Sequence, residues 1–245
     1  AISTLSMPTP ESASPWKHRV VRESAHERRR STDLATGIVT LDIVDDFVKP
    51  NTFENETATA GYYNVLLEDY NVNVELTASQ RVGFHKYTFP ESKDAHIILD
   101  MVYNVYHHNN KNVWTFIRVE NDSLVTGYRQ TKGWARTRKV FFAMKFSKAF
   151  KSYGHKKYEK VHYNGFYRRF NEEENFPEMA GKNLRAYFNF DTEDQEKINI
   201  KFALSPVSTN GALKNLEAEI PHWDFNKTRD ETKDKWNNEL SKIEV

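Results

Sequence analysis

The sequence predicts an all-β protein, a large antiparallel β-sandwich followed by C-terminal linker helices. Three observations predict this class. Apolar and polar residues alternate with period two over residues 72–89, short apolar segments then recur with polar turns between them, and the apolar spacing becomes helical after residue 210. Strands joined by short turns without intervening helical segments favour two packed antiparallel sheets over a βαβ arrangement.

The alternation is clearest where residues 72–77 read VNVELT. Every second side chain of a strand points to the same face, so this spacing places one apolar row on one side and one polar row on the other. The pattern resumes in residues 82–89 and ends at Pro90, which has no amide hydrogen to give to a neighbouring strand. These segments are predicted to be consecutive strands, each with one buried face.

Further strands are predicted on both sides of this region. Residues 1–36 hold proline, serine and threonine and are expected to be irregular, and residues 147–182 are expected to form loops or a weak edge hairpin. Asn121-Asp122-Ser123 and residues 191–196 have the composition of turns. The other predicted strands are 37–44, 95–102, 113–119, 124–128, 139–146, 184–190 and 197–204.

The last forty residues have helical spacing. Residues 211–220 are rich in leucine and alanine, and beyond Phe225 an apolar stripe returns at the intervals of one helix face, through Thr232, Trp236, Leu240 and Ile243. Such a stripe, with Trp236 as its anchor, is expected to pack on the sandwich or on a following helical domain. We therefore divide the chain into a sandwich domain, residues 1–205, and a helical linker, residues 206–245.

Composition excludes several classes of function. The chain has 35 basic and 34 acidic residues, so its net charge of +1 provides no overall attraction to nucleic acid. It has no cysteine and therefore no disulfide or thiolate metal site. No apolar run approaches the roughly 18 residues that cross a bilayer. No glycine-rich phosphate loop, G-x-S-x-G or H-E-x-x-H motif is present.

The histidines do not predict a metal site. His107 and His108 are adjacent, and neighbouring side chains of an extended segment point to opposite faces, so one metal ion cannot easily take both. His155 and His162 are seven residues apart in a stretch without helical spacing. We expect no metal ligand among them.

Three ordered blocks of sequence resemble the N-terminal domain of family 92 glycoside hydrolases, the α-mannosidases. The first block is ETATAGYY at residues 56–63 with VELTASQRVGFHKYTFP at residues 74–90, and the second combines Gly127-Tyr128-Arg129, Gly133-Trp134-Ala135 and FFAMKFS at residues 141–147. The third begins with ALSPVS at residues 203–208 and ends with Trp223-Asp224-Phe225. With the residues between and beside these blocks, the resemblance extends over roughly residues 53–243.

The resemblance implies a β-sandwich of the galactose-mutarotase-like supersandwich type, placed before an (α/α)-barrel that would follow Val245. It implies an exo-acting, inverting, calcium-dependent enzyme that hydrolyses terminal α-mannosidic linkages, of the α-1,2 type, in glycans bound between the two domains. Catalytic carboxylates and Ca²⁺ ligands are expected in the barrel, so we assign no catalytic and no metal-binding residue to this chain. A bacterial protein that is secreted, periplasmic or at the cell surface is also implied by resemblance alone.

Five residues are candidates for contact with substrate or with the partner domain: Glu56, Arg81, His85, Arg129 and Trp134. Arg81 and Arg129 are plausible donors to carboxylates across a domain boundary. Trp134 can present an aromatic face to a sugar, with burial in the core as the alternative. His85 lies within a predicted strand, where a buried, hydrogen-bonded role competes with substrate contact, and Glu56 is expected at the domain junction.

The second function that the sequence allows is a free-standing carbohydrate-binding β-sandwich module. This alternative requires sugar binding without the barrel, and fold alone does not decide between the two.

Overall fold

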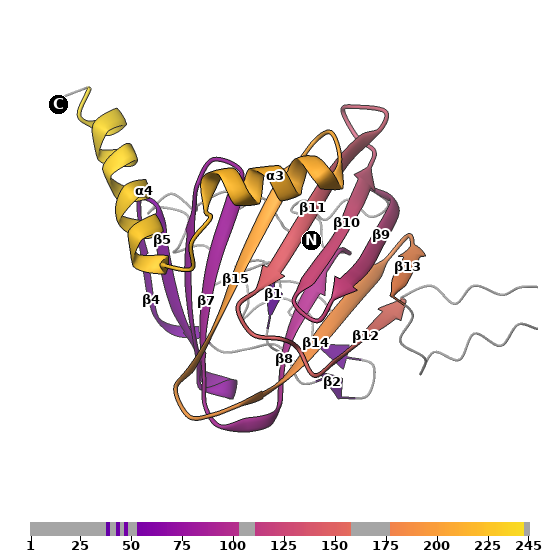
Figure 1. Ribbon diagram of the computed structural model, residues 1–245, viewed down its shortest axis with the longest axis horizontal. Coiled ribbons are helices and arrows are strands. Elements are labelled where there is room, and N and C mark those ends of the chain that lie inside the picture. The colour runs from indigo at the N-terminus through magenta and orange to yellow at the C-terminus, as the bar shows by residue number, and fades with distance from the viewer. Residues whose placement is uncertain are drawn as a thin grey trace, which may run out of the picture.

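The computed structural model describes residues 53–102, 111–157 and 177–242, with three short strands before them, and it confirms the all-β antiparallel sandwich (Figure 1). The expectations for residues 1–36, His107, His108, His162 and Ile243 lie outside the described residues. Within the described part, two α-helices follow the last strand, and neither has the length and hydrophobicity of a membrane-spanning helix.

The larger sheet has nine strands, and each is antiparallel to its neighbours. Their order across the sheet is β13-β9-β10-β11-β15-β7-β6-β5-β4. The strands are β4 (Phe53–Thr59), β5 (Tyr62–Leu67), β6 (Val72–Ala78), β7 (Val82–Phe89), β9 (Asn112–Asn121), β10 (Leu124–Thr131), β11 (Arg138–Phe146), β13 (Glu178–Gly181) and β15 (Glu196–Ser205).

The smaller sheet has four strands in the order β1-β8-β14-β12. They are β1 (Ile38–Val39), β8 (Ser92–Asp100), β14 (Leu184–Thr192) and β12 (Ser152–Lys157), and a separate pair is formed by β2 (Ile43–Val44) and β3 (Phe47–Val48). A single turn of 3-10 helix, η2 (Glu68–Tyr70), joins β5 to β6 and ends at Asn71, whose φ is 51°. The two strands described within residues 147–182, β12 and β13, are edge strands of different sheets and do not pair with each other. Residues 158–176 of that stretch lie outside the described residues.

The main core lies between the two sheets. Alternate side chains of both sheets face each other there, as the period-two spacing predicts, and the rings of Phe146, Phe150, Phe188 and Phe190 meet at one end of it. Phe188 and Phe190 belong to the smaller sheet and Phe146 to the larger, so this aromatic cluster joins the two layers.

Two helices, α3 (Thr209–Glu219) and α4 (Phe225–Leu240), cover part of the outer face of the larger sheet (Figure 1). Each begins at a side-chain cap, Ser208 for α3 and Asp224 for α4, which accepts a hydrogen bond from a backbone amide in the first turn. A second core forms beneath them from β7, β11, β15 and the helices. It consists of Val82, Phe84, Ala143, Ala203, Ala212, Leu216, Ile220 and Phe225.

Helix α4 is buried on the sheet only in its first half, although Trp236 in its second half lies beside Gly61 at the β4–β5 turn. Phe225, Thr228 and Thr232 are buried, and the Thr232 hydroxyl donates to the Ala78 carbonyl at 2.9 Å. Beyond residue 232 every side chain of the helix is exposed, and Figure 1 shows this half leaving the sandwich. Trp236, the predicted anchor, is 46% exposed.

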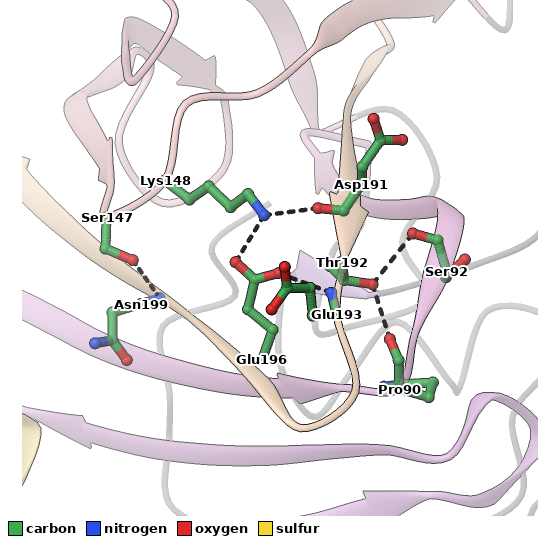
Figure 2. A network of polar contacts seen from close by, with 9 residues as sticks. All are labelled: Pro90, Ser92, Ser147, Lys148, Asp191, Thr192, Glu193, Glu196 and Asn199. Carbon is green, nitrogen blue, oxygen red and sulfur yellow. Dashed lines mark hydrogen bonds and ion pairs between the residues drawn. The ribbon is translucent and has the colours of Figure 1, made fainter.

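The chain crosses between the sheets three times at one end of the sandwich, which we call the crossover end: Pro90–Glu91, residues 147–151 and residues 193–195. Figure 2 shows the polar contacts that join these crossings. Lys148 donates to the Asp191 carbonyl at 2.7 Å and pairs with Glu196 at 2.6 Å, and the Thr192 hydroxyl donates to the Pro90 carbonyl at 2.8 Å. This network therefore fixes the three crossings to each other.

Candidate functional site

The opposite end of the sandwich, which we call the loop end, carries the predicted site residues Arg81, Arg129 and Trp134. It consists of the β6–β7 turn (residues 79–81), the β10–β11 loop (residues 132–137) and residues 206–208, which lead into α3. Antiparallel pairing places these connections at the same end, opposite the crossings. Three strand spacings, ~14 Å, separate the β6–β7 turn from the β10–β11 loop.

Trp134 lies at the tip of the β10–β11 loop. Its relative exposure is 110%, and the Gly133 amide donates to the Ala135 carbonyl at 3.0 Å across it. A Cβ placed on Gly133 would meet nothing within 4 Å. Trp134 is therefore outside the core, with its ring open to a sugar or to a neighbouring domain.

A buried polar network underlies this loop. Asp100, at the end of β8, accepts the Arg185 Nε–H at 2.8 Å, while the Asn112 side-chain oxygen accepts the Arg129 Nε–H at 2.8 Å. Burial lowers the pKa of Arg129 to about 10, opposed by the charge of Asp100. Arg129 is thus held inside the loop end by Asn112, which also donates to the Met101 carbonyl at 2.9 Å.

Arg81 joins the sandwich to α3 through Glu219. The Glu219 carboxylate accepts from the Arg81 side chain at 2.5 Å, the Arg81 amide at 2.9 Å and the Ser79 hydroxyl at 2.5 Å. Burial alone would raise the pKa of Glu219, but donation by Ser79 and Arg81 holds it below its ordinary value. Arg81 therefore serves an ion pair within the described residues.

We expect Glu219→Gln to lower the free energy of unfolding by about 1–2 kcal/mol, because the amide weakens three donor contacts to a partly buried carboxylate. The half-exposed Arg81 keeps this figure small. Urea unfolding measures the loss. Glu217→Gln on the same helix is the control, since its carboxylate is 63% exposed and lies 3.5 Å from Lys145. Equal losses in the two variants would contradict the role assigned to Glu219.

His85 and Glu56 lie away from the loop-end surface. His85 is 5% exposed in the core, where its Nδ1 is 3.1 Å from the Tyr87 hydroxyl, and burial lowers its pKa to about 4. Glu56, on β4, accepts the Tyr63 hydroxyl at 2.8 Å. The structure thus brings Arg81, Arg129 and Trp134 to one end of the sandwich but does not bring His85 and Glu56 into contact with them.

We expect acid to weaken the fold through His85. Its folded pKa of about 4 lies below the ordinary value of 6.5, so the unfolded chain binds the proton first. Stability is then complete above pH 6.5 and falls as the pH drops toward 4, by up to about 3 kcal/mol. Urea unfolding at pH 7 and pH 4.5 should show a smaller difference for His85→Gln than for the unsubstituted chain, and an unchanged difference would refute the assignment.

No group of three or more histidine, aspartate or glutamate side chains in the described part of the chain could hold a metal ion. The half-buried carboxylates of the outer face already have partners: Glu75, for example, pairs with Lys86 and accepts the Tyr62 hydroxyl.

The fold and the loop end define a class, a large antiparallel β-sandwich domain with a helical extension on its outer face. The chain belongs to glycoside hydrolase family 92. The model of the glycosyl hydrolase family 92 N-terminal domain matches residues 41–205, and that of the family 92 catalytic domain matches residues 211–245. The second match begins within α3 and includes α4.

Solved structures agree with this assignment. The chain is 36% identical, with a TM-score of 0.67 over 78% of its length, to the family GH92 α-mannosidase BT3965 from Bacteroides thetaiotaomicron. The same enzyme in complex with mannoimidazole gives 32% identity and a TM-score of 0.70 over 84% of the chain. The inverting mannosidase BT2199 from this organism is similar in fold, with a TM-score of 0.67 over 85% of the chain at 23% identity.

The chain spans about a quarter of the length of these solved relatives, 25% of BT3965 and 26% of BT2199. No curated protein sequence matches it significantly.

Sequence reasoning missed the partners of Arg129. Asp100 was visible as a charged residue at the end of an apolar run, AHIILD at residues 95–100, and a charge in that place is typical of a buried ion pair at a strand end. The ion-pair partner of Asp100 is Arg185, which lies 85 residues further along the chain. Nothing in the local sequence connects the two.

Proposed function

We propose that this chain is the sandwich part of an α-mannosidase that hydrolyses terminal α-mannosidic linkages when it is joined to its catalytic barrel. The observation that supports this most directly is the pair of consecutive family matches, the N-terminal domain over residues 41–205 and the catalytic domain from residue 211. Identity of 36% to a family GH92 α-mannosidase supports the substrate class.

The part assigned to the sandwich is that of a scaffold. The helices α3 and α4 belong by sequence to the catalytic domain but pack on the larger sheet, so the barrel would begin close to the loop end. Ligands tend to bind at domain boundaries. Trp134 would then line one side of the glycan pocket, with Arg129 supporting the loop from beneath.

The chemistry is assigned to the barrel. An inverting glycosidase needs a general acid and a general base about 6.5–9.5 Å apart on opposite sides of the sugar, and Ca²⁺ would orient the sugar hydroxyls there. Among the described residues none is assigned to these roles. The α-1,2 preference and a secreted, periplasmic or cell-surface location of a bacterial enzyme remain part of this proposal.

Release of mannose from α-1,2-linked mannobiose tests the proposal. We expect the complete enzyme to release mannose, to lose this activity with a calcium chelator and to regain it with Ca²⁺, while this chain alone should release none. Comparable turnover by the chain alone would overturn the scaffold role. Absence of turnover by the complete enzyme on any α-mannoside would overturn the function itself.

A carbohydrate-binding module is the second candidate, favoured by two exposed tryptophans near the loop end, Trp134 and, on β9, Trp114 at 44% exposure. It predicts that this chain binds neutral mannose oligosaccharides by itself. Calorimetry separates the two functions, because the scaffold role predicts no measurable affinity for neutral sugars in the absence of the barrel.

A further inference from the structure

The β10–β11 loop and its flanking residues form the hairpin tip, residues 132–139, whose sequence is KGWARTRK. Half of its residues are basic, none is acidic, and every side chain is exposed. The whole chain has a net charge of only +1, so this is a local concentration of positive charge. The basic residues are Lys132, Arg136, Arg138 and Lys139.

Arg136 and Arg138 differ from the other arginines of the described residues. Each of the others has a partner, which is a carboxylate for Arg81, Arg118, Arg185 and Arg229 and an amide oxygen for Arg129. No carboxylate in the described part of the chain lies within 4.0 Å of Arg136, Arg138 or Lys132. As far as the described residues show, the guanidinium groups of Arg136 and Arg138 and the ammonium group of Lys132 are therefore available to an external anion.

Aromatic surface adjoins these charges. Trp134 projects from the same tip. Lys139, at the start of β11, lies 4.6 Å above the centre of the Tyr128 ring, and it is the strand partner of Gln130 on β10. On its other side, Gln130 is the strand partner of the exposed Trp114 on β9. Open indole rings pack on the apolar face of a sugar, and planar guanidinium groups match phosphate or carboxylate oxygens.

We propose that the hairpin tip binds glycans that carry an anionic group, a phosphate or a carboxylate, next to a mannose unit. Arg136 and Arg138 hold the anion, and Trp134 packs on the sugar ring. The proposal rests on the proposed function, since it names the substrate class at the same loop end. Tryptophan and arginine also suit a protein interface, but lysine is depleted in interface cores, and all four like charges of this segment would need partners there, which makes a buried interface the less suited occupant.

The test is a titration of this chain, labelled with nitrogen-15, followed by the indole N–H resonance of Trp134, which Trp134→Phe identifies. The ligands are mannose, mannose 6-phosphate, mannuronate and inorganic phosphate. At low salt we expect at least one charged sugar to bind about tenfold more tightly than mannose, and raising the ionic strength to about 0.5 M should weaken this binding. The tighter of the two charged sugars identifies the anion.

The double variant Arg136→Gln/Arg138→Gln should weaken binding of the charged sugar about tenfold. The matched control is Lys93→Gln/Lys197→Gln, which removes the same charge from exposed positions at the crossover end and should change the affinity less than about twofold. Circular dichroism checks that both variants are folded.

Three results would overturn the proposal: equal affinity for mannose and both charged sugars, binding of inorganic phosphate as tight as that of the tighter charged sugar, or equal weakening in the two double variants. The last would show a bulk charge effect only. Hydrolysis of a neutral α-mannoside by the complete enzyme tests the proposed function separately, so either idea can fail without the other.

Discussion

Gly127→Ala is expected to abolish the stable fold or to lower the free energy of unfolding by about 3 kcal/mol or more. Gly127 lies in the middle of β10, and a Cβ there would stand 2.1 Å from the Phe116 carbonyl oxygen and 2.6 Å from the Phe142 ring. The first of these is backbone of the neighbouring strand, so relief requires β9 and β10 to separate. Thermal unfolding followed by circular dichroism measures the loss.

Gly133→Ala is the matched control, since a Cβ at Gly133 meets nothing within 4 Å. It should change stability by less than about 0.5 kcal/mol. A melting temperature for Gly127→Ala within about 2 °C of the unsubstituted chain would contradict the packing described between β9, β10 and β11.

Phe188→Ala is expected to lower the free energy of unfolding by about 3–5 kcal/mol. Phe188 is fully buried, and its ring centre lies 5.2 Å from that of Phe146 and 5.1 Å from that of Phe150. Removing the ring leaves a cavity where the two sheets meet, next to the crossings that prevent the sheets from closing on it. Urea unfolding measures the loss.

Trp134→Ala removes a larger ring and should cost less than about 0.5 kcal/mol, because that ring is exposed. Phe188→Leu should fall between the two. Similar losses for Phe188→Ala and Trp134→Ala would refute the assignment of the inter-sheet core.

Period-two spacing predicted the sandwich because the face of each strand that meets the other sheet must be apolar. The same spacing says nothing about what covers the second face. Lys201, on the polar row of β15, is 1% exposed because the corner between α3 and α4 lies over it, and its Nζ donates to the Ile220 carbonyl at 2.9 Å. Burial lowers the pKa of this amine to about 8, an effect that no local pattern predicts.

Strand boundaries were less well predicted where pairing rather than composition decides them. The segment expected at 124–128 continues to Thr131, because polar residues on β10 still pair with β9 and β11. In residues 147–182, β12 and β13 each pair with a strand distant in sequence, β14 and β9. Such long-range pairing has no signature in the edge strands themselves.

The candidate site was predicted only in part. The position of Arg129 and Trp134 at one end follows from strand order, which the alternation does not supply. The basic residues around Trp134 can be seen in the sequence, but whether they have acidic partners depends on which strands lie beside the hairpin. His85 shows the reverse case, because its place on an inward-facing strand position was sufficient to make burial a strong alternative to substrate contact.

Because α4 is buried on the sheet only in its first half, a small tilt of the helix displaces its C-terminal end the most. The last buried residue of α4 is Thr232, whose hydroxyl donates to the Ala78 carbonyl, and the segment from there to Leu240 measures ~12 Å at 1.5 Å per residue. A tilt of ~10° about Thr232 would displace Leu240 by ~2 Å over that length. A side chain introduced at Gly61, where an added Cβ would meet the Thr232 methyl group at 2.7 Å, would thus displace the C-terminal end of α4 by more than it displaces Thr232.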